Sequence, residues 1–151
     1  MDTIIDDDRA ARAPTSFVRA DDIAWAWPTG RILMALLFGI SGLLKFAFHA
    51  PIAGAIASKG LPVPDLLAWG AALLECAGAA ALVLGFRLRA TAAVLAIWSL
   101  LTAILFHAFW AAQGMEQQTQ LASFLKNIAI IGGLMVVAYA APRHRSAITN
   151  A

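Results

Sequence analysis

Four long apolar stretches alternate with short polar connections along the chain. They cover about residues 31–48, 65–85, 88–110 and 124–141. Each is close to the roughly 20 residues that a helix needs to cross a bilayer. The turn between the second and third stretches is short, so these two helices must be antiparallel neighbours. The pattern predicts an all-α integral membrane protein whose residues 23–142 form an up-down-up-down four-helix bundle.

Composition agrees with this prediction and excludes several classes of protein. Of the 151 residues, 61% are hydrophobic and 13% are charged, and the mean hydropathy is +0.76. Soluble domains have about 45–50% apolar and about 25% charged residues. The net charge of +2 does not indicate nucleic-acid binding, because the basic residues are scattered at the ends of the predicted helices. The single cysteine, Cys76, excludes an intrachain disulfide and a CxxC redox pair.

Basic residues flank the apolar stretches mainly on one side. That side holds 8 of the 11 Lys and Arg residues: Arg9, Arg12, Arg19, Arg31, Arg87, Arg89, Arg143 and Arg145. Under the positive-inside rule, both termini then lie in the cytoplasm. Residues 1–22 are expected to form a flexible cytoplasmic tail and residues 143–151 a short basic tail, and the acidic start is unlike a cleavable signal peptide. The expected location is the bacterial inner membrane, with lipid around the helices.

Ionisable and polar side chains interrupt the apolar stretches at a few positions. Ser41, Lys45 and His49 share one face of a helix, at i, i+4 and i+8. Glu75 lies near the middle of the second stretch, among small residues that favour helix contact. Lys126 opens the fourth stretch. Because a charge inside a bilayer is costly without a partner or a wet cavity, we expect a polar pocket or an ion-pair network in the outer half of the bundle.

Several roles are open to these residues. Glu75 is a structural partner of Lys45 or Lys126, a carboxylate that handles protons or binds a quinol-like headgroup, or a protonated group that faces lipid. His107 suits a hydrogen bond to a quinone carbonyl, a proton relay or a structural role. Haem b needs axial ligands that face each other across a bundle, and would use His49 with His107.

Glu75 and His107 are therefore the candidate catalytic residues. The expected quinone or lipid pocket draws on a wider set: Lys45, His107, Trp110, Lys126 and Asn127. Trp110 and Asn127 also have ordinary explanations, as a membrane-interface aromatic and an interhelical hydrogen-bonding group. The sequence shows no metal-binding motif and fixes no cofactor, and a quinone is the cofactor that this set would suit.

Four segments and one carboxylate carry a resemblance to a known family. They are GRILMALLFGISGLLKF at 30–46, Glu75, GFRLRA at 85–90, FHAFW at 106–110 and FLKNIAIIGGL at 124–134. In this order and spacing, over roughly residues 29–141, they resemble the DoxX family of small bacterial and archaeal membrane proteins. The resemblance implies a four-helix membrane bundle and a loose link to membrane redox chemistry, through thiosulfate oxidation and quinone reduction. The acidic and arginine-containing N-terminal extension is not part of the family pattern.

The leading hypothesis is an accessory subunit of a membrane redox or respiratory complex, because the connections leave no room for a soluble catalytic domain. Its partner would be a larger membrane complex or another copy of the chain. The alternative is a quinone-reactive oxidoreductase subunit, with Lys45, Glu75, His107 and Lys126 lining a pocket on the periplasmic side. A second alternative is a small transporter or channel with Glu75 in its path. The chain carries no self-contained catalytic motif that would decide whether it is an enzyme.

Overall fold

The computed structural model describes residues 24–141, and this region is all-helical. Its elements are α1 (Ala26–Ala47), α2 (His49–Ser58), α3 (Pro64–Leu84), α4 (Leu88–Phe106), the short 3-10 helix η2 (Phe109–Ala111) and α5 (Gly114–Ala140). Four candidate membrane spans are long and apolar enough to cross a bilayer, namely α1, α3, α4 together with η2, and α5. The predicted all-α membrane architecture is confirmed for this region. The tails expected at 1–22 and 143–151 lie outside the described residues.

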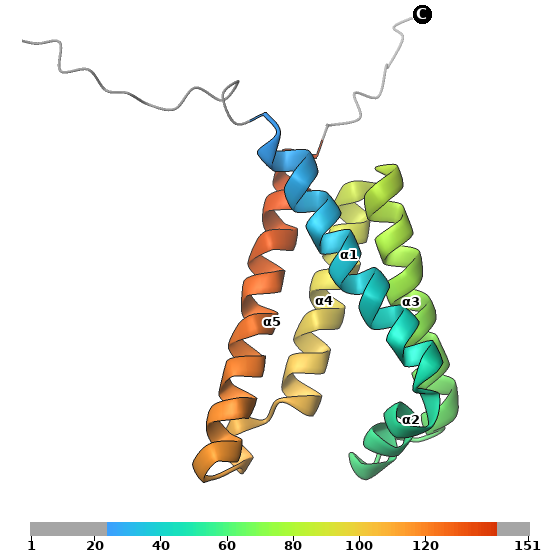
Figure 1. The fold of residues 1–151 in the computed structure, drawn as a ribbon, viewed down its shortest axis with the longest axis vertical. Helices are drawn as coiled ribbons and strands as arrows, with labels where there is room; N and C mark the ends of the chain where they lie inside the picture. The colour runs from blue at the N-terminus through green and yellow to red at the C-terminus, as the bar shows by residue number, and fades with distance from the viewer. Residues whose placement is uncertain (1–23, 142–151) are drawn as a thin grey trace, which may run out of the picture.

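The four long helices form two closely packed pairs, α1 with α3 and α4 with α5 (Figure 1). Smaller contacts join α3 to α4 and α1 to α5. The start of α1, the end of α5 and the α3–α4 turn lie at one end of the bundle, which we call the turn end (Figure 1). α2 packs against α3 at the opposite end, which we call the α2 end (Figure 1).

A buried apolar core holds the bundle together towards the turn end. It consists of Ala35, Phe38, Ala79, Leu82, Leu88, Ala92, Leu95, Leu134, Val137 and Ala141. Its largest fully buried side chains are Leu82, Leu95 and Leu134, from α3, α4 and α5 respectively. Lipid tails are as apolar as these side chains, so in a membrane the core stabilises the fold by tight packing rather than by removal from water.

α1 and α3 approach closely because small residues face each other. A Cβ added at Gly42 would lie 2.6 Å from Cys76 Sγ and 3.0 Å from the backbone oxygen of Ala72. Gly39 has an ordinary contact, since its added Cβ would lie 3.5 Å from Ala79 Cβ. Gly42 is therefore the position where α1 comes closest to the backbone of α3 among the glycines of α1.

A tight turn at Gly85 reverses the chain between α3 and α4. Gly85 has φ +73°, a conformation that glycine adopts without strain. The Phe86 N–H donates to the Ala81 carbonyl over 2.9 Å, as in a Schellman motif. The turn makes α3 and α4 antiparallel neighbours, as the short connection predicts.

Four local features differ from the expectation based on sequence. α2 occupies a connection expected to be irregular, and it tolerates Pro51 because this residue lies in the first turn, where N–H groups have no partner within the helix. α5 begins at Gly114, well before the expected span, because the polar residues there are good helix formers that hydropathy does not count. α4 ends at Phe106, since His107 leaves the helical conformation with φ −123°. Asp65, an acidic residue at the start of the second apolar stretch and so a candidate cap from sequence, lies in the first turn of α3, and Val63 is at the N-cap position.

Gly42→Ala tests the contact between α1 and α3. We expect it to lower the free energy of unfolding in detergent by about 1–3 kcal/mol, because overpacking against backbone atoms cannot be relieved by a rotamer change. Gly70→Ala in α3 is the matched control, since nothing lies within 4 Å of its added Cβ. The control should be neutral or slightly stabilising, because alanine is the better helix former. Equal stability of the two variants would contradict the close contact.

The orientation in the membrane remains a prediction that cysteine labelling can test. In a Cys76→Ala background, Lys59→Cys places a thiol between α2 and α3, and Phe86→Cys places one in the α3–α4 turn. We expect a membrane-impermeant maleimide to label the Lys59→Cys thiol in intact spheroplasts, and the Phe86→Cys thiol only after permeabilisation. The reverse pattern would overturn the assignment of both termini to the cytoplasm.

Candidate functional site

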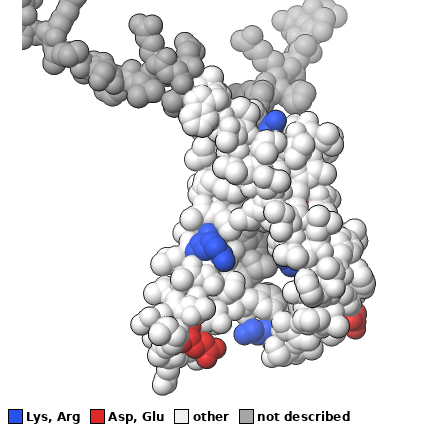
Figure 2. All heavy atoms as spheres, in the orientation of Figure 1, with Lys and Arg blue, Asp and Glu red and all other residues white. Residues whose placement is uncertain are grey.

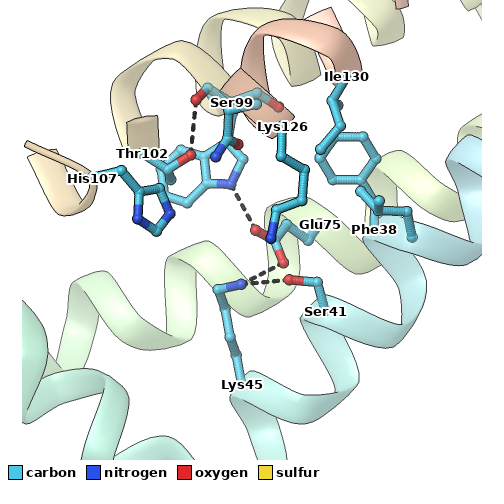
Figure 3. A pocket seen from close by; sticks show the side chains of 12 residues that line it. Phe38, Ser41, Lys45, Glu75, Ser99, Thr102, His107, Lys126 and Ile130 are labelled. Atoms are coloured by element: carbon cyan, nitrogen blue, oxygen red, sulfur yellow. Dashed lines mark hydrogen bonds and ion pairs between the residues drawn. The ribbon is translucent and has the colours of Figure 1, made fainter. Parts of the chain in front are cut away.

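An ion pair between α1 and α3 is the central polar contact of the bundle. Lys45 Nζ lies 2.7 Å from Glu75 Oε2 and donates a second hydrogen bond to Ser41 Oγ over 2.8 Å (Figure 3). Of the two lysines that the sequence offers to Glu75, Lys45 is therefore the partner. The side chain of Glu75 is 5% exposed and that of Lys45 is 19% exposed. The carboxylate is thus buried, while the ammonium group keeps some access to the space beside it.

The other carboxylate oxygen of Glu75 binds α4. Trp98 Nε1 donates a hydrogen bond to Glu75 Oε1 over 2.8 Å (Figure 3). An ionised carboxylate only accepts hydrogen bonds, and bonds to a charged acceptor are stronger than neutral ones. Glu75 therefore ties α1, α3 and α4 together. We call Lys45, Glu75 and Trp98 the polar network.

A cavity of about 300 Å³ opens beside the polar network. Figure 2 shows a hollow in this part of the molecule, with basic side chains around it. Five of the six residues that the sequence singled out line the cavity: Lys45, Glu75, His107, Lys126 and Asn127. Leu37, Phe38 and Ile130 add an apolar wall. We call this space the polar cavity, and it draws on α1, α3, α4 and α5.

Lys126 is a second lysine of the polar cavity, and it has no ion-pair partner among the described residues. Its side chain extends from α5 into the cavity (Figure 3). Among residues 24–141, no carboxylate lies within 4.0 Å of its Nζ atom. Asn127, the next residue, uses its Nδ2 atom to donate to the Ser123 carbonyl over 3.0 Å. Since Lys45 and Glu75 neutralise each other, Lys126 gives the cavity a net positive charge.

His107 lines the polar cavity just after the end of α4. Its Nδ1 atom lies 3.1 Å from Gln120 Oε1, an acceptor, so the tautomer that satisfies this contact has its proton on Nδ1, and Nε2 has no hydrogen-bond partner among residues 24–141. The hydroxyls of Ser99 and Thr102 also line the cavity, but both already donate to backbone carbonyls of α4. They are left as acceptors towards a ligand.

Trp110 lies apart from the polar cavity. α4 ends at Phe106, so Trp110 falls in η2, and its ring packs edge-on against Phe109 and Phe124 with centroids 5.1 Å and 6.0 Å away. The side chain is 56% exposed. The structure therefore places Trp110 in an aromatic cluster at the α2 end and not in the pocket for which the sequence offered it.

His49 and His107 have separate surroundings. His49 is not among the residues that line the polar cavity, and its ring stacks on Trp69 with centroids 4.1 Å apart. Its Nδ1 atom lies 3.8 Å from Asp65 Oδ1. The structure thus places His49 outside the polar cavity that His107 lines.

Trp98 is the member of the site that sequence reasoning missed. An indole counts as apolar in a hydropathy pattern, and its N–H becomes important only when the fold brings it to Glu75. A usable signal was present, because Trp98, Ser99 and Thr102 place polar atoms on neighbouring turns of an otherwise apolar helix.

The wall of the polar cavity as a whole offers an ammonium donor, an imidazole acceptor and a positive charge, which suit a small polar head that accepts hydrogen bonds.

Removal of the Glu75 charge tests the polar network. We expect Glu75→Gln to lower the free energy of unfolding by about 3 kcal/mol, the lower end of the range for broken buried pairs, because Lys45 is partly exposed. The double variant Lys45→Glu/Glu75→Lys should recover part of this loss. Lys126→Met is the control, since Lys126 has no ion-pair partner in the described region, and it should not destabilise the bundle. If Glu75→Gln is as stable as the wild type, the ion pair does not stabilise the bundle.

Known proteins match the chain over most of the described region. The DoxX family matches residues 26–108. Inner membrane protein YphA of Escherichia coli K12 is 32% identical over 112 residues, which cover 74% of this chain and 80% of the relative. Inner membrane protein YqjF of the same organism is 36% identical over 112 residues, which cover 74% and 81%. No solved structure matches the chain. The chain is thus a multi-pass inner-membrane protein and belongs to the DoxX family.

Proposed function

We propose that the protein binds the headgroup of a quinone in the polar cavity and serves as a membrane subunit of a redox assembly. The observation that carries this proposal is the ammonium group of Lys126, which has no ion-pair partner among residues 24–141 and lies beside a carboxylate that Lys45 already neutralises. The carbonyl oxygens of a quinone accept hydrogen bonds and cannot donate them, so a quinone site needs donors. Lys126 supplies such a donor, and about 300 Å³ is the lower end of the usual volume of small-molecule sites.

The residues around the cavity have distinct parts in this proposal. When bound, a quinone supplies coupled electron and proton transfer. Lys126 binds and orients the head, and the free Nε2 atom of His107 offers a position for a proton at the cavity wall. Glu75 has a donor on each oxygen, so it serves to fix Lys45 and the shape of the wall. The proposal therefore gives proton handling to His107 in preference to Glu75.

We include a redox assembly because a bound quinone must exchange its electrons with another protein. Residues 24–141 consist of membrane helices and short connections, with no soluble domain among them. Large apolar side chains are exposed on all four long helices, for example Leu33, Leu73, Ile97 and Met135. These faces contact lipid and leave area for a larger membrane complex or a second copy of the chain.

A purely accessory subunit is the second candidate, and one observation favours it. Lys45 and Glu75 satisfy each other with good geometry, and Trp98 takes the remaining oxygen. Such a network would also serve a purely structural role, in which it fixes the register of three helices and no ligand binds. This candidate and the quinone site differ in whether the polar cavity binds anything.

Titration of the purified chain in nanodiscs with a tailless quinone separates the two candidates. We expect saturable binding to the wild type and at least about tenfold weaker binding to Lys126→Met, because a hydrogen bond from a charged group contributes about 1.5–3 kcal/mol. Lys59→Met is the control, since Lys59 lies between α2 and α3 and does not line the cavity. Its affinity should equal that of the wild type.

Two results would count against the quinone site. If the wild type shows no saturable binding, the accessory role is favoured. If Lys126→Met binds as the wild type does, the ligand does not depend on the polar cavity as proposed. Melting curves of the variants, recorded on the same samples, show that a loss of binding is not a loss of fold.

A further inference from the structure

A second cavity adjoins the polar cavity and has a different character. Its volume is about 280 Å³, and it shares part of its wall with the polar cavity: Lys45, Trp98, Thr102 and His107. The rest of its wall is apolar, from Ile52, Ala55 and Ile56 of α2, Ala71 of α3 and Phe106 of α4. We call it the apolar cavity. The two spaces meet at the edge of the polar network.

α2 is built into the bundle in a way that maintains the apolar cavity. Ala53 and Ile56 of α2 are buried against Ala68 of α3, and Ile52 and Phe106 pack on this small cluster. The cluster is separate from the main core at the turn end. α2 therefore has an anchor of its own, which holds it beside the polar network as a wall.

We infer that the apolar cavity receives the first part of the tail of a membrane quinone whose head lies in the polar cavity. This inference rests on the proposed function and narrows the ligand to an amphiphile with a polar head and an apolar tail. A tail that leaves the polar cavity must pass apolar surfaces, because polar groups that face it would lose their hydrogen-bonding partners. The adjoining cavity offers such surfaces on α2, α3 and α4. The junction of head and tail then lies between Lys45 and His107, which belong to both walls.

Two matched variants of α2 test the path of the tail. Ala55→Trp adds bulk at the wall of the apolar cavity, at an exposed position where the larger side chain does not have to enter the core. Ala57→Trp on the same helix is the control, since Ala57 is exposed and lines neither cavity. Both variants are reconstituted as the full chain in nanodiscs. Each is titrated with a tailless quinone and with the same head carrying a decyl tail.

We expect Ala55→Trp to bind the decyl quinone at least tenfold more weakly than the wild type, and the tailless quinone within twofold of it. Ala57→Trp should match the wild type for both ligands. Undiminished binding of the decyl quinone by Ala55→Trp, or an equal loss of both ligands, would overturn the path through the apolar cavity. If the wild type binds neither ligand, the proposed function itself fails, which is a different result.

Photolabelling of the wild type provides a second measurement that does not depend on a substitution. A quinone analogue carries a diazirine on the first carbons of its tail, and labelled peptides are mapped by mass spectrometry. We expect labels on α2 and at Phe106. Labels confined to the outward faces of α1 and α5 would overturn the inference, because the tail would then enter lipid directly from the polar cavity.

Discussion

The ion pair between Lys45 and Glu75 is the interaction on which the polar half of the bundle depends. A lone charge in a membrane helix is costly, whereas a carboxylate that receives an ammonium group and an indole N–H is satisfied on both oxygens. The carboxylate comes from α3, the ammonium group from α1 and the indole from α4, so these groups set the relative register of three helices. They also determine the charge of the adjoining space. Since Glu75 neutralises Lys45, Lys126 is the lysine of the described cavity wall that is left to face a ligand.

Different interactions stabilise the two ends of the bundle. Towards the turn end, the leucine core brings the helices together by packing alone, and the contact at Gly42 adds to it at the level of the polar network. Towards the α2 end, polar groups and the cluster around Ile56 hold the helices around two joined cavities. Packing drives helix association in lipid, so a well-packed half is what permits the other half to stay open. This arrangement provides a rigid support for a site without a soluble domain in the described region.

The sequence predicted the architecture well because long apolar stretches have few alternatives in a bilayer. It also predicted the gathering of Lys45, Glu75, His107, Lys126 and Asn127, since charges in apolar helices must meet. It missed Trp98, whose hydrogen bond depends on three-dimensional placement. Trp110, which the sequence offered both for the pocket and as an interface aromatic, does not line the polar cavity, because α4 ends at Phe106 and nothing in the hydropathy pattern marks that end. α2 was missed because its run of small residues has no clear period.

Native mass spectrometry of the wild-type chain, released from its own membranes in mild detergent, tests the central claim most directly. If the polar cavity is a quinone site, the chain carries a bound mass equal to that of a membrane quinone, at about one per chain. A quinone-binding protein purified from the same membranes shows that the conditions preserve such complexes. If that protein keeps its quinone while this chain carries no ligand or phospholipid only, the polar cavity is not a quinone site. The polar network then has a structural role alone.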